Sequence, residues 1–505
     1  MTTDAPLSFD EMNLASLRLR AAIVAASDDY FAEKDNLLKP SDAVFLPEEY
    51  TDRGKWMDGW ESRRKRTPGH DWALVRLGVP GVVHGVCIDT AFFRGNFPSH
   101  ASLEGCAAPS DASEAVLRSS DTDWVEILPK SVLRGDSKNL FKIESPFAFS
   151  HVRLNIFPDG GVARLRVHGS AVPDFHRLGH LHGEADLASA ELGADVILAS
   201  DMFFGERRNL IMPDRALHMG DGWETRRRRG PGSDWAILAL AARGTVERVL
   251  VDTHHFKGNF PDTCSIDVCD ARGATAASLA RSDLWRPLLA PTRLQADTRH
   301  WFEAELTPAG PVTHARLNVF PDGGVSRLRL YGSVTGIDRK DLGLRRLNTR
   351  LGSVAEEQLF ACAGSRTWAR AMADRRPFAS LDALYDAARL AWSTTTESDW
   401  REAILTHPRI GETPSQHASS SAWSRQEQAR ALEATDAKAA LAEMNRAYEA
   451  RFGMRYIVCA SGKSAAELVS LAEARLANDP GKELRVVGDE LYKITRLRLD
   501  KLLEP

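Results

Sequence analysis

The clearest candidates for chemistry are a histidine at position 407 and a glutamate at position 427. His407 follows the helix-like run 400–405 and precedes Pro408, a residue type that tends to end helices. We therefore expect its imidazole at a helix C-terminus or on the next loop, where functional side chains often lie. The helix dipole would raise its pKa there, and Glu427 could orient or charge the ring. A histidine that only caps the helix is the structural alternative.

Further candidates lie within a long internal duplication. Residues 153–167 read RLNIFPDGGVARLRV, and residues 316–330, which lie 163 positions later, read RLNVFPDGGVSRLRL. The wider blocks 151–169 and 314–332 match at 14 of 19 positions, so the duplication is secure. Each copy alternates apolar and polar residues around a Pro-Asp-Gly-Gly turn. This pattern predicts a β-hairpin in each copy.

Both copies also contain an Asp-Gly-Trp-Glu block that is followed by arginines. The glutamates of the two blocks are Glu61 and Glu224. Such a block could bind an anionic substrate, because a guanidinium group forms two parallel hydrogen bonds with a carboxylate. The structural alternative is a network in which the glutamate pairs with arginine and the tryptophan fills the core.

The copies diverge in one block, which reads DTAFFRGN from Asp89 and DTHHFKGN from Asp252. Features that occur in only one copy are the better candidates for chemistry. His255 could act as a general base, since its unperturbed pKa lies near neutrality. On a strand, His254 and His255 would point to opposite sides and would not easily bind one metal. A surface or core histidine is the alternative.

The elements that must position these residues are of two kinds. Short alternating runs, such as 236–240 and 246–251, are separated by Gly, Pro and Asp and predict an all-β sandwich for each copy. After Gly332 helical periodicity dominates, with Ser380 and Ser464 as predicted N-caps. The predicted domains are residues 1–172, 173–338 and 339–505.

The composition narrows the classes of partner. The 505 residues carry a net charge of −4, which gives no reason to expect nucleic acid or a membrane surface. The six cysteines form no CxxC pair, and the acidic N-terminus lacks the apolar stretch of a signal peptide. We expect a cytoplasmic protein that acts on small molecules. The oligomeric state, including a homo-oligomer, is left open.

The duplicated part resembles allantoicase over residues 20–335. The resemblance rests on the doubled motifs DGWE-[ST]-RR-x-R, DT-x-x-F-x-GN-x-P and F-PDGG-V-x-RLR. It implies two tandem all-β, jelly-roll-like sandwiches that hydrolyse allantoate to ureidoglycolate and urea. The family's second-copy histidine and lysine correspond to His255 and Lys257.

Allantoate has one carboxylate and two ureido groups on one carbon. Its site therefore needs a cation, amide or carboxylate partners for the ureido groups, and a base that activates water. The candidate residues are Glu61, Asp89, Glu224, Asp252, His255, Lys257 and Asn259. A divalent metal such as Mn²⁺ stays open, because the sequence shows no diagnostic ligand spacing.

The last third resembles 2-oxo-4-hydroxy-4-carboxy-5-ureidoimidazoline (OHCU) decarboxylase over residues 345–505. The motifs are HPRIGE from His407, SRQEQ from Ser424 and IVCA from Ile457. The resemblance implies a cofactor-free, all-α helical bundle that makes (S)-allantoin, with His407 as catalytic residue and Glu427 as its acidic partner. The implied substrate contacts are Pro408, Ser424, Arg425, Gln428, Ile457, Val458, Cys459, Ala460, Ser461 and Arg496.

The sequence thus predicts a multidomain, bifunctional enzyme of purine catabolism. The two reactions are not consecutive, because allantoin must be opened to allantoate between them. The alternative is a tandem β-sandwich module that only binds a ligand and is tethered to an active decarboxylase, since fold alone does not separate binding from catalysis.

Overall fold

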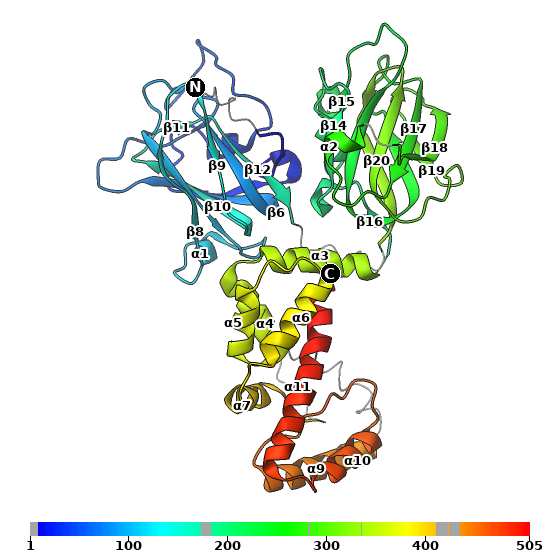
Figure 1. The fold of residues 1–505 in the computed structure, drawn as a ribbon. Helices are drawn as coiled ribbons and strands as arrows, with labels where there is room; N and C mark the ends of the chain where they lie inside the picture. Colours follow the sequence, from blue (N-terminus) through cyan, green and yellow to red (C-terminus); the bar gives the residue numbers. More distant parts are fainter. Residues whose placement is uncertain are drawn as a thin grey trace, which may run out of the picture. The chain divides into compact units, whose positions relative to one another are not determined.

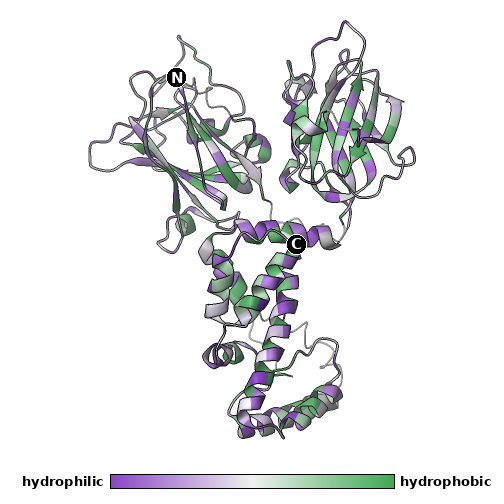
Figure 2. Cartoon of the chain, viewed as in Figure 1, coloured by the Kyte–Doolittle hydropathy of each residue, from purple (hydrophilic) through white to green (hydrophobic). Residues whose placement is uncertain are grey.

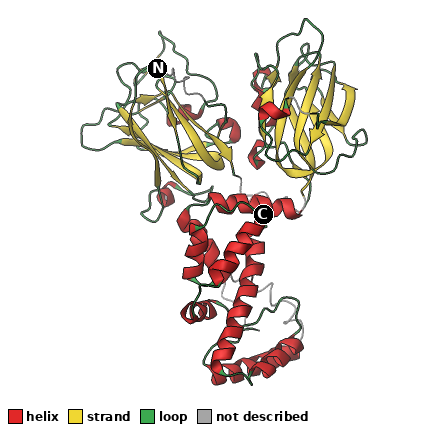
Figure 3. Cartoon of the chain, viewed as in Figure 1, coloured by secondary structure: helices red, strands yellow, loops and turns green. Residues whose placement is uncertain are grey.

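The computed structural model describes residues 9–172, 183–280, 283–334, 336–410, 423 and 435–504. The chain forms two compact units, Met1–Asp338 and Arg339–Pro505 (Figure 1). The first unit consists mainly of strands and the second of helices (Figure 3). The predicted fold class, two all-β sandwiches followed by an all-α domain, is confirmed.

The first repeat is built around one eight-stranded sheet with the order β1-β12-β6-β10-β7-β8, in which β2 and β9 also pair with β6. Its strands are β1 (Met12–Asn13), β2 (Ala22–Ala26), β6 (Asp71–Asp89), β7 (His100–Cys106), β8 (Val125–Val132), β9 (Lys138–Lys142), β10 (Ala148–Phe157) and β12 (Arg164–Ala171). Smaller elements are β3 (Tyr50–Thr51), β4 (Gly54–Lys55), β5 (Trp60–Glu61), β11 (Gly161–Val162), η1 (Leu17–Leu19), η2 (Lys34–Leu38) and α1 (Glu114–Leu117).

The second repeat has the same topology, with the order β13-β22-β16-β20-β17-β18 and with β14 and β19 paired to β16. Its strands are β13 (Ala185–Asp186), β14 (Asp195–Ala199), β16 (Asp234–Asp252), β17 (Thr263–Cys269), β18 (Arg286–Arg293), β19 (Arg299–Phe302), β20 (Val312–Phe320) and β22 (Arg327–Val334). Smaller elements are β15 (Trp223–Glu224), β21 (Gly324–Val325), η4 (Ala190–Leu192), η5 (Arg207–Ile211), η6 (Met219–Asp221) and α2 (Ala276–Leu279).

One long strand in each repeat joins the two layers of the sandwich. Residues 71–76 of β6 pair with β2 and β10, whereas residues 85–89 pair with β9 and β12. The separate short strands predicted at 236–240 and 246–251 are likewise parts of the single 19-residue strand β16. Hydrophobic and hydrophilic residues are interspersed along these strands (Figure 2), as expected where one side faces a core.

The predicted hairpin at 153–167 is wrong. Strands β10 and β12 lie on either side of β6 and bond to it rather than to each other. The Pro-Asp-Gly-Gly turn between them is bound instead to the loops beside it. Gly161 N–H donates to the Asn96 carbonyl (2.7 Å), and the Asp159 carboxylate accepts from Lys65 N–H (2.7 Å). The alternation was read correctly, but local periodicity does not specify the partner strand.

The second unit contains eight helices within its described residues. They are α3 (Gly336–Thr349), α4 (Gly352–Ala363), α5 (Arg366–Asp374), α6 (Leu381–Trp392), α7 (Glu397–Thr406), α9 (Thr435–Phe452), α10 (Ala465–Arg475) and α11 (Pro480–Leu503). The predicted N-caps Ser380 and Ser464 are confirmed, because each side chain accepts a backbone N–H of the first turn. None of the helices described is both long and apolar enough to cross a membrane.

The helical unit has two hydrophobic clusters. The larger is formed mainly around Trp368, Leu384 and Leu491, where α11 packs against α4, α6 and α7. The smaller joins α9 and α10 around Leu441 and Tyr448. The segment 456–460 contributes residues to both clusters and so runs between them. This packing fixes that segment opposite the end of α7.

Candidate active sites

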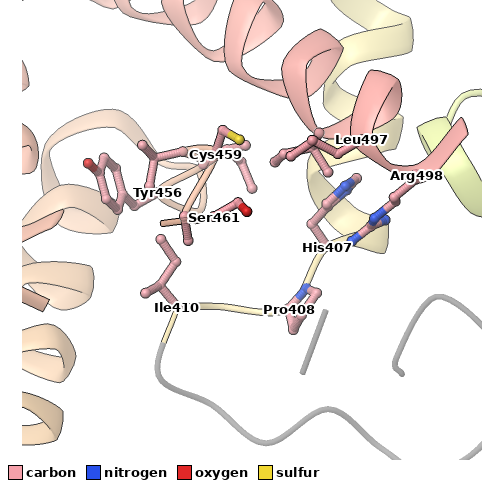
Figure 4. Close-up of a pocket in the computed structure, with 12 residues that line it drawn as sticks. His407, Pro408, Ile410, Tyr456, Cys459, Ser461, Leu497 and Arg498 are labelled. Carbon is pink, nitrogen blue, oxygen red and sulfur yellow. The ribbon is translucent and has the colours of Figure 1, made fainter. Parts of the chain in front are cut away.

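A small cavity of about 30 Å³ lies in the helical unit between the end of α7, the segment 456–461 and α11 (Figure 4). It brings together His407, Pro408 and the whole predicted segment 457–461. Its lining residues are His407, Pro408, Ile410, Tyr456, Ile457, Val458, Cys459, Ala460, Ser461, Ile494, Leu497 and Arg498. The predicted Ser424, Arg425, Glu427 and Gln428 lie outside the described residues.

His407 is held by the helix that it terminates. It is the C-cap of α7, is only 4% exposed, and directs Nδ1 at the Ala403 carbonyl, 2.7 Å away. A carbonyl can only accept, so Nδ1 carries the proton and Nε2 keeps its lone pair. Nε2 is buried and has no hydrogen-bond partner among the described residues. The ring therefore offers a proton acceptor to the cavity.

The pKa of His407 moves in the direction opposite to the expected one. Burial, followed by the nearby positive charge of Arg498, lowers the pKa to about 3. The expected rise from the helix dipole is wrong, because desolvation of the charged form outweighs it. The imidazole is therefore neutral at physiological pH.

Among the described residues Arg498 is the cation that lines this cavity, whereas the predicted Arg496 does not line it. Arg498 is 2% exposed and follows Ile494 and Leu497 on the same face of α11, as helical spacing requires. Arg496 lies two positions away, and its guanidinium stacks on the Tyr385 ring, 3.1 Å from the centroid. Counting by three and four from Ile494 would have found Arg498 in the sequence.

The backbone of the segment 457–461 is fixed by charged side chains behind it. The Ile457 carbonyl accepts from Arg475 (2.9 Å), and Cys459 N–H donates to Glu490 (2.7 Å). The Cys459 carbonyl accepts from Lys463 (2.7 Å). Charge-assisted bonds of this kind are stronger than neutral ones, so they hold this wall of the cavity in place.

In the first unit, each candidate glutamate is bonded to an asparagine and not to an arginine. The Glu61 carboxylate accepts from Asn96 (2.7 Å) and that of Glu224 from Asn259 (2.5 Å). Burial raises the pKa of Glu61. One arginine of each block pairs elsewhere, Arg63 with Asp28 and Arg226 with Asp201. The same contact in both repeats joins the DGWE block to the GN block.

Asp89 and Asp252 occupy the buried ends of β6 and β16, at 3% and 1% exposure. Burial raises the pKa of Asp89. Asp252 accepts from His254 N–H (2.9 Å), while the Nε atoms of Arg215 and Arg299 lie 3.6 and 4.0 Å from its other oxygen. Asp252 is thus the centre of a charged cluster in the second repeat.

The two histidines of the second repeat lie in a turn and not on a strand, because β16 ends at Asp252. His255 adopts a φ of 70°, and the two ring centroids are 3.9 Å apart. The rings therefore do not point to opposite sides. His254 Nδ1 contacts Asp297 (2.9 Å) and His255 Nε2 contacts the Ala216 carbonyl (3.0 Å).

Two further observations on the first unit concern Lys257 and groups that could bind a metal. The predicted Lys257 is exposed at the same turn. Within the part of the chain that the structure describes, no three His, Cys, Asp or Glu side chains form a group that could hold a metal ion.

Comparison with known proteins identifies both parts of the chain. The allantoicase repeat family matches residues 12–172 and 185–335, and the OHCU decarboxylase family matches residues 352–500. A probable allantoicase of Burkholderia mallei is 50% identical over 324 residues, which are 64% of this chain and 94% of that protein.

The chain is also similar to solved structures. The crystal structure of allantoicase from Saccharomyces cerevisiae is 33% identical, covers 64% of this chain and 94% of its own, and has a TM-score of 0.55. A crystal structure of an OHCU decarboxylase is 36% identical over 30% of this chain and 99% of its own, with a TM-score of 0.26. The chain belongs to the allantoicase family and carries a C-terminal OHCU decarboxylase domain, which together make it a bifunctional enzyme of purine catabolism.

Proposed function

We propose that His407, Arg498 and the backbone of 457–461 form the site that converts OHCU to (S)-allantoin and CO₂. The observation that supports this most strongly is the neutral imidazole of His407, whose Nδ1 is anchored on Ala403 and whose Nε2 is free to accept a proton. Arg498 supplies the positive charge for an anionic substrate at the same wall (Figure 4). Pro408 and Ile410 line the adjoining wall.

The neutral imidazole of His407 can accept a proton from the substrate and then return it, and the proposed reaction uses both steps. Loss of CO₂ breaks the bond between C4 and the carboxyl carbon, and the electron pair passes into the ring C=N bond, whose nitrogen takes one proton from solvent. His407 Nε2 then removes the C4 hydroxyl proton, and the resulting imidazolium protonates C5 on one face. The product is (S)-allantoin, and the OHCU decarboxylase family needs no cofactor for this. Glu427 is proposed to stabilise that imidazolium, and Ser424, Arg425 and Gln428 to contact substrate.

The experiment replaces His407 by glutamine in the full chain. We expect decarboxylation to fall by about 10²–10⁴-fold, the usual contribution of a general base. Urea release from allantoate should stay at the wild-type rate, which also reports that the first unit is intact. Decarboxylation above one-tenth of the wild-type rate in H407Q would contradict this role. An Arg498→Lys variant tests the second role, with a raised KM as the expected result.

For the hydrolase half, the sequence nominates His255 as the catalytic residue, and Glu61 and Asp89 of the first repeat or Glu224, Asp252, Lys257 and Asn259 of the second as substrate contacts. They are supported by the Glu–Asn contacts and the buried aspartates of the two repeats. Urea release should be measured with and without added Mn²⁺, so that a metal-dependent activity is also detected. Absence of urea under both conditions would refute the hydrolase activity.

The remaining predictions concern the whole chain. We propose a cytoplasmic location, a homo-oligomeric assembly and domain boundaries at 172/173 and 338/339. They can be tested by cell fractionation, light scattering and limited proteolysis. Small molecules are the ligands of both activities.

A further inference from the structure

We propose that the second repeat holds the site that hydrolyses allantoate, with His254 as its general base. Asp297 orients that imidazole, and Arg215 and Arg299 bind the carboxylate of the substrate. This inference rests on the allantoicase activity and assigns it to one of two nearly identical folds.

The first argument is the tautomer of His254. Its Nδ1 lies 2.9 Å from the Asp297 carboxylate, and that carboxylate also accepts from His255 N–H at 2.8 Å. These hydrogen bonds lower the pKa of Asp297, so Asp297 is ionised and accepts the Nδ1 proton. Nε2 of His254 then keeps its lone pair. With 28% of the side chain exposed, water can reach this ring.

The neighbouring His255 has a different task. Its Nε2 lies 3.0 Å from the Ala216 carbonyl, so it carries the proton there and donates it to the loop that contains Arg215. His255 thus fixes one cationic loop to the turn that carries His254. The Asp–His pair is formed by the first histidine, although the family resemblance alone pointed to the second.

The first repeat has the same turn and the same carboxylate but lacks both histidines. Its Asp136 has a φ of 51° and accepts from Phe92 N–H at 2.8 Å, just as Asp297 (φ of 50°) accepts from His255 N–H. The positions of His254 and His255 are held by Ala91 and Phe92. The carboxylate and the turn therefore serve both repeats, whereas a base is present only in the second.

The residues around the buried aspartate differ in charge between the repeats. Lys138 is the strand partner of Asp89, and Arg299 that of Asp252. The carbonyls of Ser41 and Asp214 accept from Arg164 and Arg327 in matching contacts (2.9 and 3.0 Å). The residues that follow those carbonyls, Asp42 and Arg215, are therefore also equivalent.

The net formal charge around the buried aspartate therefore has opposite signs in the two repeats. Asp42, Asp89 and Lys138 carry a formal charge of −1, and Lys138 is paired with Asp42 at 3.2 Å. Arg215, Asp252 and Arg299 carry +1, and both arginine side chains are about half exposed, at 50% and 47%. An anionic substrate is therefore attracted to the second repeat and repelled by the first. His254 bonds to the same Asp252 through its backbone N–H, which places the base beside the cations.

The proposed reaction balances with water as the only co-substrate. Nε2 of His254 takes a proton from water as the water oxygen forms a bond to the methine carbon of allantoate. The bond from that carbon to one ureido nitrogen breaks, and the imidazolium returns the proton to this nitrogen. The products are ureidoglycolate and urea, and the base is regenerated.

The test uses the full chain, because its decarboxylase activity is a built-in control for the amount of folded enzyme. We expect His254→Gln to lower the kcat of urea release by about 10²–10⁴-fold. Asp297→Asn should lower kcat with little change in KM, and its matched control Asp136→Asn should change neither by more than threefold. Asparagine tolerates the positive φ of both positions, so neither variant strains the backbone. Arg215→Met should instead raise the KM for allantoate.

Three results would overturn the assignment. H254Q that keeps more than half of the wild-type urea release excludes His254 as the base. A loss of activity in D136N as large as in D297N places the site in the first repeat or in both. If the wild-type chain releases no urea with or without Mn²⁺, the chain has no hydrolase activity. This outcome is distinct from one in which the wild type is active and H254Q retains that activity.

Discussion

Arg475 and Glu483 form a buried ion pair behind the wall of the decarboxylase cavity. The closest nitrogen and oxygen are 2.5 Å apart, and the side chains are 11% and 0% exposed. The Tyr448 hydroxyl and the Asn478 amide donate to the same carboxylate. Another guanidinium nitrogen of Arg475 donates to the Ile457 carbonyl. One ion pair thus connects α9, α10 and α11 to the segment that lines the cavity.

The first prediction is that Glu483→Gln destabilises the helical unit by about 3–5 kcal/mol, because it leaves the buried charge of Arg475 without its partner. Denaturant unfolding followed by circular dichroism measures this. The control is Asp386→Asn, which removes an exposed i,i+3 pair with Arg389 and should cost at most about 0.5 kcal/mol. Equal effects of the two variants would show that the buried pair contributes nothing special.

The second prediction concerns Glu490, whose carboxylate accepts from Cys459 N–H. Glu490→Ala should release the 457–461 backbone and lower kcat/KM for decarboxylation by about 10- to 100-fold, since small misplacements in an active site are costly. Glu490→Gln keeps an oxygen acceptor and should restore most of the activity. If both variants are equally impaired, the backbone hydrogen bond is not what Glu490 contributes.

The third prediction follows from the lowered pKa of His407. The unfolded chain binds a proton near pH 6.5, but the folded unit does not until about pH 3. The stability contribution is therefore complete above pH 6.5 and is lost as the pH falls, at roughly 1.4 kcal/mol per pH unit. Unfolding free energies at pH 7.5 and 5.5 should differ by about that much more in the wild type than in H407Q. Identical pH slopes for the two proteins would argue against a neutral, buried imidazole.

The fourth prediction uses glycines that are duplicated between the repeats. A Cβ on Gly324 would lie 1.9 Å from the buried ring of Phe256, and one on Gly161 would lie 2.0 Å from that of Phe93. Gly324→Ala should therefore cost about 1–3 kcal/mol through overpacking. Gly258 has nothing within 4 Å of its would-be Cβ, so Gly258→Ala should stay within about 0.5 kcal/mol. Thermal unfolding of the two variants provides the comparison.

The sequence by itself determined the features that depend on local signals. The duplicated motifs identified two copies of one fold, and the helix caps at Ser380 and Ser464 are read from a few adjacent residues. Alternation correctly marked Leu154, Ile156, Leu317 and Val319 as buried, although Asn155 and Asn318 between them are buried as well. His407 was located at a helix end because a proline follows it. Each of these signals lies within a short stretch of the chain, and the duplication adds only a comparison of two such stretches.

Only the tertiary structure decided the features that depend on distant partners. β10 and β12 pair with β6 because strand pairing joins residues far apart in the chain, which periodicity does not encode. Arg498 replaces Arg496 at the cavity because packing of α11 fixes which helical face is turned inward. The hydrogen-bond partners of His254 and His255 are supplied by other segments, and burial keeps His407 neutral. Pairing, helix rotation and desolvation arise only when the chain is folded, which is why residue types alone could nominate these side chains but not assign their roles.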